Sequence, residues 1–211
     1  MKEYHKIHTI YKRDKNTKHK TLLEGQFSLP ELEYLQNNTW VWDEKVDGTN
    51  IRIVFDGEKI RFGGKTDNAD IPANLLNRLN ERFIPQLGKF KEVFGENDTN
   101  VVFYGEGYGP KIQSIGGNYR KDQDFILFDI KIGNTWLNRD SVINISKNFG
   151  LDIVPIVGKG TLKEAIEYTR KGFNSTWGNF FAEGLVLRPE IQLLSRMGHR
   201  IITKIKYKDF G

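Results

Sequence analysis

The sequence predicts an α+β fold built on antiparallel sheets with flanking helices. Short apolar runs rich in β-branched and aromatic residues recur along the chain, and Asp56 with Gly57 forms a strong hairpin-turn signal between two of them. Segments with apolar residues at helical spacing lie between these runs. Strands and helices do not alternate regularly, which argues against a doubly wound parallel sheet. The 211 residues, 38% of them hydrophobic, suffice for one large domain with its own core.

In the first part of the chain, residues 12–28 are polar, basic and weakly patterned, so we expect a loop or an irregular arm there. A strand-rich stretch begins at 40–42, where two alternate tryptophans are expected to pack in the core. Apolar residues alternate with other residues over 51–55, which is the pattern of a half-buried strand. The return strand of the hairpin is expected at 60–62.

Helices and further strands follow. Apolar spacing predicts a helix over 72–83, with Pro85 separating it from a second short helix that carries Leu87 and Phe94. Later helices are expected over 140–149, capped by Asn138 or Asp140 and ended by Gly150, and from Thr161, which has capping-box spacing, to near Gly172. Strands are expected at four places, namely 101–104, 125–130, 184–188 and 200–207.

The charge and composition of the chain limit the classes of molecule that it is expected to bind. The net charge is +5, and both ends of the chain are basic: residues 1–20 hold seven Lys and Arg against two acidic residues, and 188–211 hold six against two. Basic ends favour a polyanionic partner such as nucleic acid or nucleotide phosphates, although a merely solvated surface has the same composition. The absence of cysteine excludes disulfides and thiolate metal sites and fits a reducing compartment. No apolar run predicts a signal peptide or a membrane span.

The segment from Glu44 to Asn50 is the centre of the functional prediction. It reads Glu-Lys-Val-Asp-Gly-Thr-Asn and joins the end of one apolar strand to the start of the next. An ordinary lysine is protonated at pH 7, and it becomes a nucleophile when burial or neighbouring cations lower its pKa. Lys45 is therefore a candidate nucleophile. The alternative is a surface hairpin with a solvated lysine.

Further segments carry groups that suit a nucleotide. Glu106 lies at a strand end among alternating glycines, which let a ligand approach the backbone while the carboxylate accepts from ribose hydroxyls. The aromatic run 125–130 offers a platform for a base, and Glu183 stands at the entry of an apolar strand. Lys204 and Lys206 share one face of a strand, where two cations can hold a triphosphate. Each segment also has a plain structural explanation, as a turn, a core strand, a solvated glutamate or the polar face of an edge strand.

In this order, the segments resemble the covalent nucleotidyltransferase superfamily of polynucleotide ligases and mRNA capping enzymes. The resemblance runs from Glu44 to Lys206, over most of the chain, and the ordered set is more specific than any one motif. It is strongest to ATP-dependent RNA ligases of the nick-sealing bacteriophage type. Three features favour that branch: the complete Glu-Lys-x-Asp-Gly-Thr-Asn run, the Lys-Ile-Gln at 111–113 and the Phe-Asp-Ile at 128–130.

The resemblance implies an antiparallel-sheet nucleotidyltransferase (adenylation) domain over 40–211, with the basic segment 1–39 as part of the same domain and no separate C-terminal domain. The implied activity uses ATP and Mg²⁺ or Mn²⁺ to form a lysine–AMP intermediate, to adenylate an RNA 5′-phosphate and to join it to a 3′-hydroxyl. The implied partners are RNA strands, in a nicked duplex or as broken RNA. We further expect no membrane partner, a monomer, and a location in the cytosol of a bacterium or of an infected host.

Site residues carry over from the resemblance position by position. The implied catalytic residues are Lys45, which carries AMP, together with Glu183, Lys204 and Lys206; the two late lysines would hold the α-phosphate and the pyrophosphate. The implied nucleotide-binding residues are Glu44 at the adenine, Asp47 and Asn50 near the sugar and phosphates, Lys65 at a phosphate, Glu106 at the ribose, and Phe128 stacked on the base. Glu183 and Glu106 would also bind the divalent metal.

One position departs from the family pattern, and three other functions compete. Family members commonly carry an arginine where this chain has Lys65, and lysine keeps the charge but lacks the bidentate fork. This weakens the expected grip on a 5′-phosphate but leaves adenylation unaffected. The competing functions are a DNA ligase, a GTP-dependent capping-type nucleotidyltransferase and a non-catalytic nucleic-acid-binding domain with a degenerate ligase fold.

Overall fold

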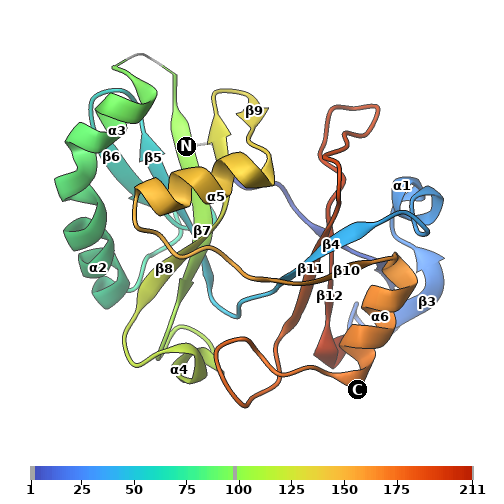
Figure 1. The fold of residues 1–211 in the computed structure, drawn as a ribbon. Helices are drawn as coiled ribbons and strands as arrows, with labels where there is room; N and C mark the ends of the chain where they lie inside the picture. Colours follow the sequence, from blue (N-terminus) through green and yellow to red (C-terminus); the bar gives the residue numbers. More distant parts are fainter. Residues whose placement is uncertain (1–2, 97–98, 211) are drawn as a thin grey trace. The chain divides into compact units, whose positions relative to one another are not determined.

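The computed structural model describes residues 3–96 and 99–210 and divides into two compact units. Unit 1 comprises Met1–His5 and Asp47–Val154, and unit 2 comprises Lys6–Val46 and Pro155–Gly211. The chain therefore passes from unit 2 to unit 1 directly after Val46, within the Glu-Lys-Val-Asp-Gly run. Each unit has its own sheet and its own core (Figure 1).

Unit 1 is built on an antiparallel five-stranded sheet in the order β6-β5-β7-β8-β9. The hairpin signal at Asp56 and Gly57 is confirmed, because β5 pairs with β6 around it and Gly57 has a φ of 94°. The strands are β5 (Thr49–Phe55), β6 (Ile60–Gly63), β7 (Val101–Tyr108), β8 (Asp124–Ile132) and β9 (Thr135–Trp136).

Helices cover one face of this sheet, and the buried residues between them form a single apolar cluster. Pro85 separates two helices as predicted, and the Asn138 side chain caps α5 by accepting from the backbone N–H of Ser141. The helices are α2 (Ala73–Phe83), α3 (Leu87–Phe94), α4 (Gly116–Tyr119) and α5 (Arg139–Asn148), with a 3₁₀ turn η1 (Ile84–Gln86) between the first two. Leu75, Leu79 and Phe83 of α2 pack on the strands.

The prediction of a half-buried strand over 51–55 was wrong, because β5 is buried on both faces. Val54 packs in a second apolar cluster with Val102 and Tyr104. Arg52 is fully buried. Its Nε donates to the Gly64 carbonyl at 2.7 Å, and its guanidinium lies 2.9 Å from the Asp67 carboxylate. A buried arginine needs such partners, and these two tie the loop after β6 to the sheet.

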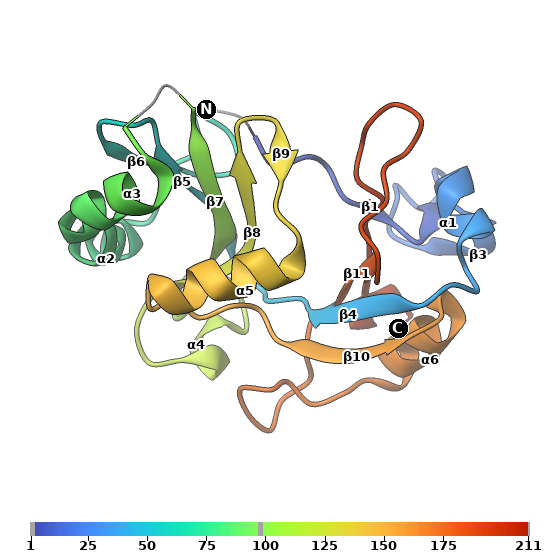
Figure 2. The same ribbon diagram turned by 45° about the horizontal axis from the view of Figure 1, so that its top comes forward.

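Unit 2 contains a five-stranded sheet in the order β1-β12-β11-β4-β10 and a separate pair, β2-β3. Only β1 and β12 run parallel; the other pairs of this sheet are antiparallel. The strands of the sheet are β1 (His8–Thr9), β4 (Trp40–Glu44), β10 (Ile156–Gly160), β11 (Gly184–Pro189) and β12 (Thr203–Lys206). Figure 2 shows β4 and β10 side by side.

The core of unit 2 contains both tryptophans of β4, as the alternation predicted: Trp40 is fully buried and Trp42 is nearly so. Three short helical segments complete the unit, namely α1 (Pro30–Tyr34), α6 (Leu162–Lys171) and the 3₁₀ turn η2 (Tyr207–Asp209). The predicted capping box at Thr161 is confirmed at the start of α6, and Gly172, with a φ of 74°, follows its last residue.

The expectation of a loop or an irregular arm over 12–28 holds only for residues 14–21, which form a turn. The segment 12–28 as a whole forms most of a small antiparallel pair, β2 (Tyr11–Arg13) and β3 (Leu22–Phe27). The pairing is local: the N–H of Asp14 donates to Thr21, and Leu22 is buried. A short hairpin that buries few side chains carries little apolar alternation, so pattern alone does not reveal it.

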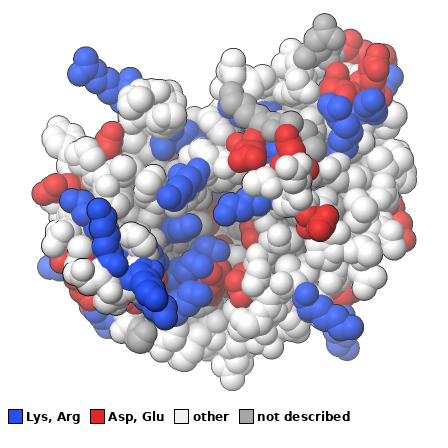
Figure 3. Space-filling model, turned by 180° about the vertical axis from the view of Figure 1, so that it is seen from behind, with Lys and Arg blue, Asp and Glu red and all other residues white. Residues whose placement is uncertain are grey.

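Among the described residues, none of the helices is long and apolar enough to cross a membrane. The chain holds 32 Lys and Arg against 27 Asp and Glu. Figure 3 shows side chains of both signs on the face that it presents.

Asp124, at the start of β8, is the centre of an ion-pair network in unit 1. Its carboxylate lies 2.8 Å from Arg82, 3.0 Å from Arg120 and 3.3 Å from Arg78, and it accepts from the N–H of Phe125. Burial alone would raise the pKa of Asp124, but the backbone donor and the three arginines lower it below its ordinary value. The network ties α2 and the segment after α4 to the edge of β8.

We predict that Asp124→Asn lowers the free energy of unfolding by about 2 kcal/mol at pH 7, because it leaves three arginines without their shared carboxylate. A lowered native pKa stabilises the fold above the unfolded value and loses that effect as the pH falls through the native value. The difference between wild type and variant should thus hold from pH 7 to 5 and shrink below the ordinary value of 3.8. Urea unfolding at pH 7, 5 and 3.5 measures it.

The matched control is Asp122→Asn, because Asp122 also pairs with Arg120 but is largely exposed. It should change stability little. Equal losses in the two variants would contradict a special role for the buried carboxylate.

Candidate functional site

Lys45 follows the last residue of β4, in unit 2. Its backbone N–H donates to the Gly184 carbonyl at 2.9 Å, so the main chain remains attached to β11 at this point. The side chain is 20% exposed, and its Nζ lies 2.6 Å from Oε2 of Glu183. The candidate nucleophile is therefore not a freely solvated lysine on a surface turn.

Glu183 is shared between two lysines. Its Oε1 lies 2.6 Å from Nζ of Lys206 while Oε2 contacts Lys45, and the carboxylate side chain is only 9% exposed. Burial by itself raises the pKa of Glu183, but the charge of Lys45 and the hydrogen bond from Lys206 outweigh burial and lower the pKa below 4.5. The carboxylate therefore stays ionised at neutral pH and holds both ammonium groups. We call these three residues the Lys45–Glu183–Lys206 cluster.

The strand register explains why these residues meet, although 138 positions separate Lys45 from Glu183. In the antiparallel β4, β11 and β12, Leu185 pairs with Glu44, and Gly184 pairs with Lys206. The end of β4, the start of β11 and the end of β12 therefore fall at one edge of the sheet. The backbone N–H of Tyr207 also donates to the Glu183 carbonyl.

The same face of the sheet carries further charge. Lys204 lies in register with Val186, which pairs with Asp43, so Lys204 and Lys206 share one face as predicted. Asp43 is buried and forms an ion pair with Arg188. This face thus combines cations with paired carboxylates, whereas the opposite face carries the core.

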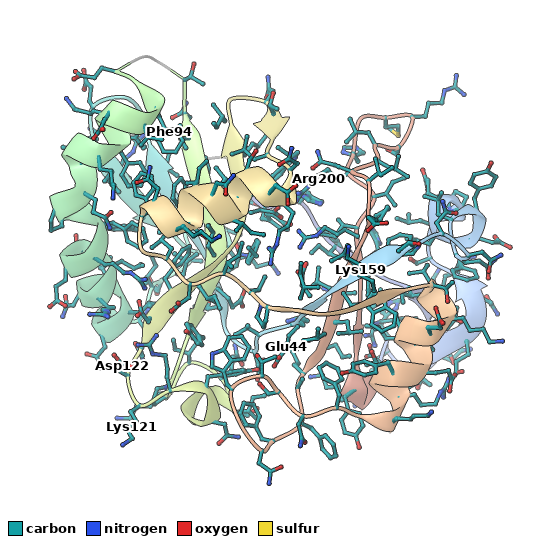
Figure 4. All side chains as sticks on the ribbon, in the orientation of Figure 1. Glu44, Phe94, Lys121, Asp122, Lys159 and Arg200 are labelled. Atoms are coloured by element: carbon teal, nitrogen blue, oxygen red, sulfur yellow. The ribbon has the colours of Figure 1, made fainter. Side chains whose placement is uncertain are left out.

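Glu44 lies on the core side of β4 and is almost completely buried (Figure 4). Its Oε2 accepts from the backbone N–H of Thr176 at 2.9 Å. Its Oε1 is buried and has no hydrogen-bond partner among the residues that the structure describes. A buried acceptor without a donor is unfavourable, and ordered water or a ligand can supply the missing donor.

In unit 1, Asn50 and Glu106 lie directly opposite one another on β5 and β7. Both are half-buried and point away from the apolar core, and Oδ1 of Asn50 is a second buried acceptor that lacks a partner among the described residues. Glu106 lies within β7, which continues to Tyr108, and not at a strand end as expected.

The expected role of the alternating glycines was also wrong. A Cβ on Gly105 would lie 2.2 Å from the Phe125 ring, and one on Gly107 would lie 2.4 Å from Leu75. Both glycines therefore face the core, where they make room for packed side chains and not for a ligand.

Phe128 lies on β8 beside a register shift between β7 and β8. The ring is half-buried and packs edge-on against Tyr4, with 5.1 Å between centroids. The Tyr4 hydroxyl donates to the neighbouring Asp129 at 2.5 Å. Residues near the N-terminus thus hold the aromatic side chain that the sequence predicts at the base.

The Asp47–Gly48 turn is held by residues far along the chain. The N–H of Asp47 donates to the Tyr119 hydroxyl at 3.0 Å, and the Gln113 side chain donates to the Gly48 carbonyl at 3.3 Å. Gly48 has no room for a side chain, because a Cβ would lie 2.3 Å from the Gly107 carbonyl oxygen. Tyr119 was not predicted from the sequence, because no local pattern distinguishes it from a core tyrosine.

Lys65 is exposed, in the loop that Arg52 ties to β5. Arg52 was not predicted as a buried residue either, because its place in an alternating strand suggested exposure to solvent. Within residues 3–96 and 99–210, no three histidine or acidic side chains gather to hold a metal ion. The two carboxylates expected to bind metal, Glu183 and Glu106, belong to different units.

We predict that Tyr119→Phe speeds hydrogen exchange of the Asp47 amide about fivefold, because it removes one hydrogen bond worth about 1 kcal/mol and keeps the ring. NMR-detected exchange measures the rate. The amides of Ile51 and Ile53 in β5 serve as internal controls and should exchange as in wild type. An unchanged exchange rate at Asp47 would show that the Tyr119 hydroxyl does not protect this amide.

The sequence and the fold of the chain were compared with those of known proteins. A sequence model of the RNA ligase family matches residues 38–207. Among solved structures, a variant of the Naegleria gruberi RNA ligase with AMP and Mn is similar, with a TM-score of 0.68 and 17% identity, over 98% of this chain and 56% of that one.

Two further structures of the same enzyme give a similar result. A variant with ATP and Mn has a TM-score of 0.65 and 19% identity, over 84% of this chain and 52% of the other. The form with PPi has a TM-score of 0.65 and 19% identity, over 94% and 55%. The chain thus spans about half the length of these enzymes and shares their fold. Since the family match covers most of its residues, from before the lysine motif to beyond the last lysine pair, the chain belongs to the RNA ligase family.

Proposed function

We propose that this chain is an ATP-dependent RNA ligase that forms a covalent AMP adduct on Lys45. The adenylate then passes to an RNA 5′-phosphate, and a 3′-hydroxyl displaces AMP to join the strands. The observation that carries the proposal is the Lys45–Glu183–Lys206 cluster, in which one buried carboxylate holds the candidate nucleophile beside a second cation. Family membership supports this reading.

In the first step, the Lys45 nitrogen forms a bond to the α-phosphorus of ATP while the bond to pyrophosphate breaks. The amine must lose a proton before it can attack phosphorus. Glu183 is a poor proton store because its pKa is lowered, so we assign it the role of orienting Lys45 while the proton leaves to solvent. Lys204 and Lys206 stabilise the charge on the phosphates, which is the main requirement of phosphoryl transfer.

Two of the buried acceptors without partners, one in each unit, are compatible with a nucleotide as the ligand. Oε1 of Glu44 and Oδ1 of Asn50 suit donors such as an adenine amino group and a ribose hydroxyl. We further propose that Phe128 stacks on the base, that Glu106 and Asp47 contact the sugar side, and that Lys65 contacts a phosphate.

We propose that a divalent metal binds together with the phosphates of ATP. Mg²⁺ is commonly bound by one or two carboxylates together with substrate oxygens and water, so it needs no three-residue cage. Glu183 in unit 2 and Glu106 in unit 1 are each proposed as a carboxylate ligand, and the metal would neutralise phosphate charge. Mn²⁺ has the same preference for oxygen ligands.

The remaining expectations are proposals of the same kind. RNA strands in a nicked duplex or broken RNA are the proposed substrates. We propose a monomer, because one copy of the chain supplies all three members of the Lys45–Glu183–Lys206 cluster. The absence of cysteine supports a reducing compartment such as the cytosol.

We predict that the protein becomes covalently labelled by α-labelled ATP in the presence of Mg²⁺ and that Lys45→Ala abolishes the label, because no other residue replaces the nucleophile. Denaturing gel electrophoresis measures the adduct. Lys159→Ala is the matched control: Lys159 lies on β10 of the same sheet and pairs with Glu190 at 2.8 Å, but both are half-exposed. Its labelling should equal that of wild type.

Two arms of this experiment separate the rival functions. Labelling by GTP alone would reject the ligase in favour of a capping-type enzyme, and absence of any label in wild type would favour a non-catalytic domain. Nicked duplexes with RNA or DNA at the 3′-hydroxyl side then separate an RNA ligase from a DNA ligase.

We also predict that Glu183→Gln slows adduct formation at least about a hundredfold, because the amide keeps the shape but releases both lysines from their shared charge. Single-turnover labelling gives the rate. Glu190→Gln is the matched carboxylate control and should change the rate less than about twofold, as expected for an exposed ion pair. A Glu183→Gln rate close to that of wild type would show that the carboxylate does not orient the nucleophile.

A further inference from the structure

The segment between β11 and β12, residues 190–202, forms a hairpin of its own that extends beyond the sheet in both ribbon views (Figures 1 and 2). We call it the 190–202 hairpin. Its stem is closed by the bonds from Ile201 N–H to Leu193 and from Ser195 N–H to His199, at 3.0 and 2.7 Å. Gly198, with a φ of 77°, completes the turn. The tip, Arg196–Met197–Gly198, is thus presented on a defined two-stranded ribbon.

Apolar side chains on this hairpin are unusually exposed. Met197 at the tip is 82% exposed, Ile191 is 76% exposed and Leu194 is 57% exposed. Single exposed apolar residues are normal on protein surfaces, but a group is typical of a contact surface. Three within the seven positions 191–197 therefore indicate that this part of unit 2 meets a partner.

The charge of the segment indicates which class of partner. Residues 191–208 contain five Lys or Arg and no acidic residue. Arg196 is exposed and adjoins Met197, while Arg200 lies in the stem (Figure 4). Arginine beside an exposed apolar side chain is the combination with which many proteins enter a groove of a nucleic-acid duplex, where the cation contacts phosphate and the apolar group contacts sugars or bases.

The second strand of the hairpin continues directly into β12, which carries Lys204 and Lys206. A duplex bound by the hairpin is therefore held by the same ribbon that forms part of the Lys45–Glu183–Lys206 cluster. In an A-form duplex the major groove is deep and narrow and the minor groove is wide and shallow, so the tip of a two-stranded ribbon reaches only the latter.

We propose that the 190–202 hairpin docks in the minor groove of an A-form RNA duplex beside the strand break, with Arg196 on the phosphates and Met197 against sugar and base edges. The proposal rests on RNA as the substrate and adds the surface that recognises the duplex. It assigns a role to residues outside the nucleotide site.

Binding of a nicked, 5′-phosphorylated RNA duplex, measured by fluorescence anisotropy from 50 to 200 mM salt, tests the proposal. Arg196→Ala should raise the Kd roughly five- to tenfold near 0.1 M salt and reduce the slope of log K against log salt by about 1, because one phosphate contact is lost. Met197→Ala should raise the Kd roughly threefold or more without changing that slope, because an apolar contact releases no counterions.

Two variants in the same unit serve as matched controls. Lys163→Ala removes an exposed cation from α6, and Tyr34→Ala removes an apolar side chain that is 87% exposed on α1. Neither should change the Kd or the salt slope. A B-form DNA duplex and single-stranded RNA should respond less to Met197→Ala than the RNA duplex does.

The proposal is overturned if Arg196→Ala and Met197→Ala both bind the nicked RNA duplex like wild type. That result is expected if a second copy of the chain or another protein segment covers the hairpin. Labelling by ATP without RNA separates this outcome from failure of the proposed function: both variants should form the Lys45 adduct at the wild-type rate. Loss of labelling in wild type would instead reject the ligase activity and leave the binding result intact.

Discussion

The chemistry that we propose for this chain depends on one buried carboxylate, Glu183, which pairs with two lysine side chains. Glu183 can hold Lys45 and Lys206 together because three antiparallel strands end at the same edge of the unit 2 sheet. Removing any of these charges leaves the others buried without compensation, which is far less favourable than an exposed pair. The register of β4, β11 and β12 is therefore a structural constraint on this cluster, because a shift of one residue would turn the lysines toward the core. Under the proposed function it is a catalytic constraint as well.

The features that were predicted correctly from the sequence are those that depend on residues close together in the chain. Capping at Asn138 and Thr161, the break at Pro85 and the turn at Gly57 each depend on neighbours within a few positions, and all are confirmed. The alternation of side chains along a strand likewise predicted that Lys204 and Lys206 share a face. The ordered motifs indicated the family, which the match over residues 38–207 confirms.

Long-range contacts explain most of what the sequence did not reveal. Arg52 sits in an alternating strand yet is buried, because a carbonyl and a carboxylate from the next loop receive it. Tyr119 supports the Asp47 backbone from 72 positions away. The division into two units could not be predicted from the sequence either, because the boundary falls inside the lysine motif, where composition does not change. Such features depend on which distant atoms surround a side chain, and single-sequence patterns carry no record of them.

The crowding at Gly48 has a consequence for reading related sequences. This glycine abuts the carbonyl oxygen of Gly107, which in turn packs against Leu75, so the backbone would require both glycines even in a molecule that transfers no nucleotide. A descendant that had lost its activity would still retain them, as long as it kept its fold. Retention of Gly48 and Gly107 thus reflects the fold, whereas retention of Lys45 together with Glu183 would, under the proposed function, be the better sign of a working enzyme.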